Sequence, residues 1–323
     1  MAFRPASTGP LWACFLIALS IASRAAGDAP RIERLPPVAS AAADEVALAG
    51  YDDEVPLMTP PSSVASRAHD GRTWQVLPDG LMYKSYLAGV KEPRFASQWV
   101  NERTGGQIWD IAIGGRVGIL RHGTRDPLEP EGWQVDLEGA AFPRIDVARE
   151  SDLVACDYRM GIPLTHAEGP HHYKIGYYHI SSHLGDEWIL RYPGQLRRIN
   201  YVRDSILVGY SYYWRKDFRF YGETACALGS GEGTEPWEFQ FGVEYSPAKP
   251  TGLRPVPFVA VNGHLREEVD FGGNVTVQSG WQWRGATGHL LRMGMHCYVG
   301  MSDQYEFYDE YESKVGFGIW YDY

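Results

Sequence analysis

The chain has 323 residues, with 40 acidic and 30 basic side chains, a net charge of −10, and many Tyr, Trp and Gly residues. No basic patch stands out against this charge, so the composition argues against a nucleic-acid-binding protein. Beyond the N-terminal apolar run, no apolar stretch is long enough to predict a membrane-spanning helix.

Residues 1–26 have the pattern of a secretory signal peptide. Arg4 precedes an apolar run over residues 11–22, and the small residues Ser23 and Ala25 follow where signal peptidase would cut. The run is too short for a membrane helix and has the right length for the apolar part of a signal. We therefore predict that the mature protein is exported.

The next two segments are predicted to lie in the periplasm. Residues 27–73 are rich in Ala, Pro, Asp and Glu with little periodicity, which is typical of a disordered linker. Residues 74–93 are more structured, with Leu81, Tyr83 and Tyr86 available for packing. They predict a short periplasmic element at the mouth of a barrel.

From residue 94 to 323 the chain divides into strand-like segments separated by Gly, Pro and charged turns. In Trp237–Tyr245, aromatic and aliphatic residues alternate strictly with Glu, Gln and Gly. Side chains of a strand point alternately to its two faces, so such a segment has a lipid-facing side and a polar side. About twelve such segments start near Arg94, Gln107, Gly132, Ser151, His171, Arg198, Phe218, Trp237, Pro255, Asn274, Gly288 and Tyr311. This pattern predicts an all-β fold, an antiparallel transmembrane β-barrel of about twelve strands in the outer membrane.

The polar faces of these segments carry charges of both signs, which we assign to the lumen. With both termini on the periplasmic side, the connections after odd-numbered strands would point outward. A barrel of this size is more often filled by side chains than open, although a narrow polar path is the alternative. The inward charged residues are Asp110, Arg116, Asp136, Glu138, Asp157, Arg159, Glu238, Glu244, Arg284 and Arg292.

The last segment places Val315, Phe317, Ile319, Tyr321 and Tyr323 on one face. It resembles the C-terminal sorting signal of bacterial outer-membrane barrels, although a glycine stands where that signal usually has a polar residue. The resemblance implies the barrel assembly machinery as a partner.

A wider resemblance rests on Leu77–Arg94, Tyr178–Glu187 and Arg198–Tyr201. With these segments the chain resembles the family known as domain of unknown function 1207, over about residues 74–323. The resemblance implies an outer-membrane barrel and no established activity.

A smaller resemblance concerns His179-Ile-Ser181, which is similar to the His-x-Ser strand motif of outer-membrane phospholipase A and lipid A deacylase barrels. In those enzymes the histidine is the base and the serine the nucleophile, on the lipid-facing wall. The resemblance implies a serine-type lipid esterase acting on outer-membrane lipids.

The alternation of the strand adds residues to this candidate site. His179, Ser181 and His183 continue the lipid-facing side, and Asp204 interrupts the apolar face of the next strand. A carboxylate on a lipid-facing surface is costly unless it is paired, so Asp204 is predicted to orient a histidine, with Asn200 as a second candidate. His183 competes with His179 as the base, because it also lies two residues from Ser181.

Two alternatives remain open at this stage. These polar residues would also be tolerated without chemistry in the lipid headgroup zone, which leaves a structural or filled barrel of unassigned activity. No cofactor or metal site is predicted; Asp186 and Glu187 most simply cap an exposed loop, although a calcium site there is conceivable.

Overall fold

The computed structural model describes residues 71–194 and 198–323. The predicted signal peptide and residues 27–70 of the predicted linker lie outside the described residues. Over the part that is described, no helix has the length and apolar character needed to cross a membrane.

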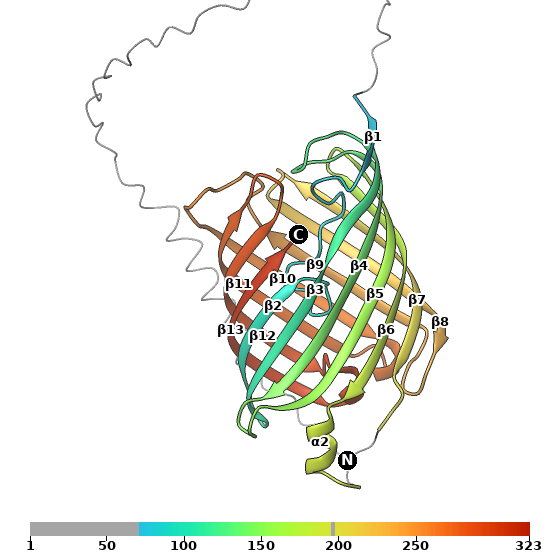
Figure 1. The fold of residues 1–323 in the computed structure, drawn as a ribbon, viewed down its shortest axis with the longest axis vertical. Helices are drawn as coiled ribbons and strands as arrows, with labels where there is room; N and C mark the ends of the chain where they lie inside the picture. The colour runs from blue at the N-terminus through green and yellow to red at the C-terminus, as the bar shows by residue number, and fades with distance from the viewer. Residues whose placement is uncertain (1–70, 195–197) are drawn as a thin grey trace, which may run out of the picture.

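Twelve antiparallel strands, β2 to β13, close into one barrel (Figure 1). Each strand pairs with its neighbours in sequence, and β2 closes the ring by pairing with both β3 and β13. The predicted fold class is thus confirmed. The barrel strands are β2 (Phe95–Glu102), β3 (Gly106–Gly123), β4 (Gly132–Asp146), β5 (Asp152–Glu168), β6 (His171–Leu184), β7 (Val202–Trp214), β8 (Phe218–Ser230), β9 (Trp237–Tyr245), β10 (Val256–Arg266), β11 (Gly273–Arg284), β12 (Leu290–Met301) and β13 (Tyr311–Asp322).

Four short elements complete the chain. The strand β1 (Thr73–Val76) pairs with the last residues of β3, 120–123, and is not one of the twelve barrel strands. A single helical turn and a half, α2 (Asp186–Arg191), lies between β6 and β7, and two 3₁₀ turns, η1 (Glu267–Val269) and η2 (Tyr305–Phe307), follow β10 and β12.

The two faces of the barrel wall differ as the alternation predicted. On β9, Glu238 and Glu244 are buried in the lumen while Phe241 is exposed. Large aromatic side chains are exposed on the outside all around the ring, which suits a wall in contact with lipid and its interfaces. The exposed outer-wall aromatics include Trp99, Trp133, Tyr158, Tyr173, Tyr177, Tyr210, Trp214, Phe220, Trp237, Phe241, Trp281 and Phe317.

The connections divide between the two ends of the barrel. Phe95 and Tyr323 lie together, with ring centroids 6.2 Å apart, so the barrel begins and finishes at one end. That end carries the short turns 169–170, 215–217 and 285–289 and the longer connections 124–131 and 246–255. The opposite end carries 103–105, 147–151, 185–201, 231–236, 267–272 and 302–310. The connections predicted to follow odd-numbered strands therefore share one end, and the barrel's first and last strands meet at the other, which in membrane barrels is the periplasmic end.

Ion pairs across the strands fill much of the lumen. Arg144 binds Asp110 at 2.7 Å, Asp303 at 2.6 Å and Glu312 at 2.5 Å, and Lys314 shares the same carboxylates. Burial opposes ionisation of Asp303, but Lys314 and Arg144 outweigh it and hold the pKa of that carboxyl well below its usual range. Most of the predicted inward charges are thus in ion pairs, whereas Arg284 donates to the Ser246 hydroxyl and the Pro247 carbonyl oxygen.

The segment of residues 77–94 enters the barrel, which corrects our prediction of an element at its mouth. The rings of Tyr86 and Tyr221 stack with centroids 3.9 Å apart, and the Tyr86 hydroxyl donates to Glu223 at 2.8 Å. Further along, Lys91 pairs with Asp157 at 2.6 Å. The segment lacks a regular strand pattern because its backbone groups bond to luminal side chains instead of to a neighbouring strand.

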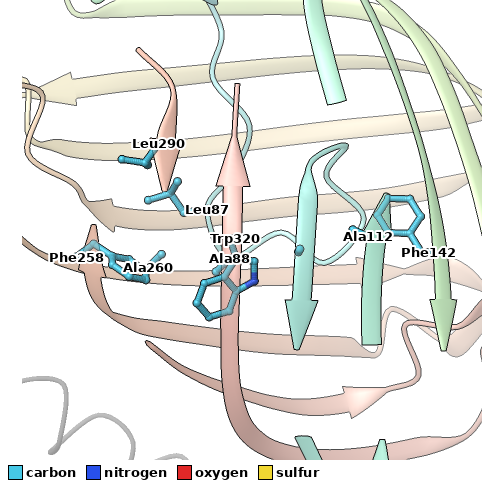
Figure 2. Close-up of a cluster of buried hydrophobic side chains, with 9 residues drawn as sticks. Leu87, Ala88, Ala112, Phe142, Phe258, Ala260, Leu290 and Trp320 are labelled. Atoms are coloured by element: carbon cyan, nitrogen blue, oxygen red, sulfur yellow. The ribbon is translucent and has the colours of Figure 1, made fainter. Parts of the chain in front are cut away.

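Figure 2 shows the apolar part of this plug. Leu87 and Ala88 of the entering segment lie among inward side chains of the strands, including Phe258 and Trp320. Trp320 is 1% exposed and is the largest of the fully buried side chains. An apolar cluster inside a charged lumen excludes water from the ion pairs around it.

The connection 302–310 folds into the lumen from the other end. The Tyr305 ring stacks on Tyr201 with centroids 4.6 Å apart, and its backbone N–H donates to Asp157 at 3.3 Å. Asp157 therefore joins both plugs, since it also binds Lys91. The described residues block the barrel from both ends.

We expect the purified protein to show almost no conductance in planar bilayers, because two plugs and paired charges occupy the lumen. Ion currents at increasing voltage measure this directly, with a known open porin as the positive control. Large steady channels from the intact chain would contradict a filled lumen.

Candidate functional site

The candidate site lies on the outer wall at β6, near the end of the barrel that carries the 185–201 connection. On this strand Tyr178, Ile180 and Ser182 are buried toward the lumen. The intervening residues Tyr177, His179, Ser181 and His183 face outward, as their alternation predicted. The strand therefore holds a hydroxyl and two imidazoles on the surface that faces lipid.

His179 and Asp204 meet across the β6–β7 pair, where they are direct partners in the register. The His179 Nδ1 lies 2.9 Å from the Asp204 Oδ1, and the two side chains are 32% and 36% exposed. The Tyr177 hydroxyl donates to the same carboxylate oxygen at 2.5 Å. Two donors thus satisfy a carboxylate that would otherwise be costly on this wall.

A β-bulge shapes the far side of this contact. Asp204 pairs with Gly229, but Ser205 pairs with Ala227, so one extra residue of β8 lies between them. A Cβ at position 229 would come within 3.5 Å of the Asp204 Oδ2. That distance is an ordinary van der Waals contact, so the position does not require glycine, and the bulge itself is the irregularity that lies beside Asp204, as bulges often do next to functional sites.

Ser181 faces outward between Tyr158 of β5 and Val202 of β7, its partners in the two registers. Among the described residues, its hydroxyl makes no hydrogen bond with His179 or His183. Residues two apart on a strand share a face, so Ser181 and His179 are neighbours on the outer wall. Such contacts are often long in a free enzyme and shorten when substrate binds.

The structure separates the remaining candidates from this pair. His183 is exposed and its ring lies 5.8 Å from that of Tyr158, away from Asp204. Asn200 is exposed in the segment before β7, and it is Asp204 that bonds His179. The choice of Asn200 as an orienting residue is therefore not supported by the geometry.

The hydrogen bond to Asp204 decides which nitrogen of His179 is available. With Nδ1 donating to the carboxylate, the neutral ring keeps Nε2 as an acceptor. A base oriented by a carboxylate in this way is suited to remove a proton from a neighbouring hydroxyl.

Sequence reasoning missed Tyr177. It lies two residues before His179 and so shares the outward face of β6. Its bond to Asp204 depends on the β6–β7 register, and so the sequence alone offered no signal for it.

The acidic pair Asp186 and Glu187 begins α2 and is exposed. Calcium is bound by six to eight oxygen ligands, usually including several carboxylates. Within residues 71–194 and 198–323, no group of three or more His, Cys, Asp and Glu side chains gathers to hold a metal. Two exposed carboxylates fall short of the ligand set that calcium prefers.

Comparison with solved structures agrees with the fold. The outer membrane phospholipase of Salmonella typhi, crystallised as a dimer with bound calcium, is similar with a TM-score of 0.50 and 11% identity, covering 74% of this chain and 91% of that one. Outer membrane phospholipase A from Escherichia coli is similar with a TM-score of 0.47 and 9% identity, covering 71% and 92%. At these identities the likeness shows a barrel fold of the outer-membrane type and nothing about activity.

No curated protein sequence matches the chain. A family model does match, over residues 62–323, and it includes the whole barrel and both luminal plugs. The chain belongs to the family described as "Protein of unknown function (DUF1207)".

Proposed function

We propose that this protein is an outer-membrane lipid acyl-ester hydrolase, with Ser181 as nucleophile, His179 as base and Asp204 as the orienting carboxylate. The observation that carries the proposal is the 2.9 Å contact between His179 Nδ1 and Asp204 Oδ1 on a lipid-facing wall, two residues from an outward serine.

The reaction needs only these groups, an ester and water. The Ser181 hydroxyl oxygen attacks the ester carbonyl carbon while its proton passes to His179 Nε2. The same proton then goes to the leaving alkoxide, which departs as a lysolipid and leaves an acyl group on Ser181. Water attacks this acyl group, His179 takes and returns a proton, and the products are a fatty acid and free Ser181.

The position of the site indicates which lipids it meets. It lies near the barrel end opposite the chain termini, which we assign to the extracellular side. The substrate would therefore be a lipid of the outer leaflet, with its ester in the headgroup zone beside Ser181. Outer-membrane lipids are the partner that this location favours.

The proposal is tested with wild-type protein folded in detergent and given phospholipids, lipopolysaccharide and short-chain nitrophenyl esters, each with and without calcium. We expect release of free fatty acid from at least one lipid ester. If no substrate is turned over in either condition, these polar residues belong to a structural barrel in the headgroup zone, which is the competing function.

The identity of the base can be tested separately. We expect His179→Ala to reduce kcat by a factor on the order of a thousand, because general-base catalysis typically contributes 10²–10⁴-fold and the acyl-enzyme must also form. His183→Ala is the matched control on the same face and two residues from Ser181, and it should change kcat less than about threefold. Equal losses of kcat in the two variants would contradict the assignment of His179, the histidine that Asp204 orients, as the base.

A further inference from the structure

A shallow furrow crosses the outer wall and ends at His179. It has a volume of about 380 Å³, and its outward lining residues are Ile113, Gly139, Ala141, Tyr158, Met160 and His179. This volume falls within the range of sites that hold small ligands. Exposed bulky residues border it, and the two small residues of β4 form its floor.

The strand register shows that the furrow and the proposed site form one continuous surface. Gly139 is the partner of Met160, and Met160 is the partner of His179. In the next row Ala141 is the partner of Tyr158, and Tyr158 is the partner of Ser181. Ser181 therefore lies one strand from Tyr158 at the edge of the furrow and two strands from Ala141 on its floor.

The furrow also has a far end. Gly139 pairs on its other side with Gly115 of β3. A Cβ at position 115 would lie 2.5 Å from the ring of Tyr323, so that ring already occupies the space above Gly115. His179, Met160, Gly139 and Gly115 form one row across the wall, so the Tyr323 ring lies at the end of the row that begins at His179.

The direction of the furrow fits a lipid chain. In Figure 1 the strands β3 to β6 lean, so that a line at right angles to them climbs from β6 toward β3 and toward the C-terminus. With a strand tilt of about 40°, this line runs away from the headgroup zone of the proposed extracellular side and into the hydrocarbon region.

We propose that this furrow holds one acyl chain of the lipid whose ester lies at Ser181, and that Tyr323 limits the chain to about ten to twelve carbons. The inference rests on the proposed function and names the substrate class of that site. Three strand spacings from β6 to β3 span ~14 Å, and an extended chain advances ~1.25 Å per carbon, which gives the length. The occupant is a hydrocarbon because the furrow is apolar and opens on the lipid-facing wall.

The test compares Gly139→Leu with a matched control, Gly222→Leu. Position 139 has room for a side chain, since an added Cβ would meet only the Arg159 carbonyl oxygen at 3.5 Å. Gly222 is exposed on β8, far around the ring, with nothing within 4 Å of its Cβ position. Both variants place a leucine on the lipid-facing wall, so any effect of the substitution on barrel assembly should be the same in the two.

The first readout is kcat/KM for phospholipids of one headgroup with acyl chains of about eight to eighteen carbons. We expect wild-type protein to have its highest kcat/KM for chains of about ten to twelve carbons. Gly139→Leu should lower kcat/KM for those chains at least about tenfold and leave kcat/KM for shorter chains unchanged. Gly222→Leu should keep the wild-type profile. A profile that Gly139→Leu leaves unchanged would overturn the furrow as the acyl site.

The second readout does not need turnover. Ser181→Ala protein is exposed to a phospholipid with a photoreactive group at the end of a twelve-carbon chain, and adducts are mapped by mass spectrometry. We expect adducts on the peptides around Gly115 and Tyr323, which decline in the double variant with Gly139→Leu. Equal labelling around Gly222 refutes the furrow, whereas furrow labelling without any wild-type hydrolysis refutes only the catalytic proposal.

Discussion

Ser181→Ala should abolish lipid hydrolysis, with kcat reduced at least about a thousandfold, while the barrel still folds. Removing the nucleophile of a serine hydrolase leaves only the contribution of binding and of the remaining groups. The residue is outward and makes no hydrogen bond among the described residues that its loss would break. Turnover by purified variant, and its migration on SDS gels with and without heating, measure activity and folding together.

Asp204→Ala should reduce kcat by a factor on the order of a hundred, which is less than the loss expected for Ser181→Ala. The orienting residue of a triad carries only part of the catalytic effect. Asp204→Asn is the finer control, since an amide keeps the size of the side chain but can hold His179 in the wrong tautomer. Turnover that survives Ser181→Ala would remove this serine from the mechanism, whatever the effect at Asp204.

Arg292→Ala should destabilise the barrel by about 3–5 kcal/mol, because it leaves buried acceptors without their cation. Arg292 is fully buried and donates to Asp322 at 2.8 Å, to Gln278 at 2.7 Å and to the Leu87 carbonyl oxygen at 3.1 Å. Its guanidinium also lies 5.1 Å from the ring centroids of Phe258 and Trp320. The substitution therefore weakens both the wall and the plug.

Denaturant unfolding of protein folded into lipid vesicles measures this loss. Lys216→Ala is the control, because Lys216 pairs with Glu129 at 2.5 Å in an exposed turn, where its side chain is 69% exposed. That change should leave the free energy of unfolding nearly unchanged, because an exposed ion pair contributes little to stability. Similar losses in the two variants would show that the luminal pairs do not stabilise the barrel.

The number of strands and the orientation of their side chains were determined by the sequence alone. In Trp237–Tyr245 each residue differs from its neighbours in polarity, and the buried Glu238 and exposed Phe241 lie on the faces that this pattern predicted. Alternation is a local property, since lipid on one side and a polar lumen on the other select each residue in turn. The starts of the twelve strands could be predicted for the same reason.

Only the tertiary structure placed the luminal plugs. Residues 77–94 have no period of two, and their partners lie far along the chain, such as Asp157 for Lys91 and Glu223 for Tyr86. Local sequence patterns do not predict such pairing. The plug is stabilised by burial and by contacts between charges that meet only when the barrel closes. The sequence therefore predicted an ordered segment but placed it at the barrel mouth, whereas it lies in the lumen.

The candidate site divides in the same way. The outward faces of His179, Ser181 and Asp204 followed from strand alternation, but the choice of Asp204 over Asn200 depended on the β6–β7 register across the 185–201 connection. The contact of Tyr177 with Asp204 and the furrow also depend on strand register. Gly139 and Ala141 form the floor of the furrow only because bulky residues of the neighbouring strands lie on either side of them. Which side a residue faces is set within one strand, but which residues meet is set between strands, by closure of the barrel.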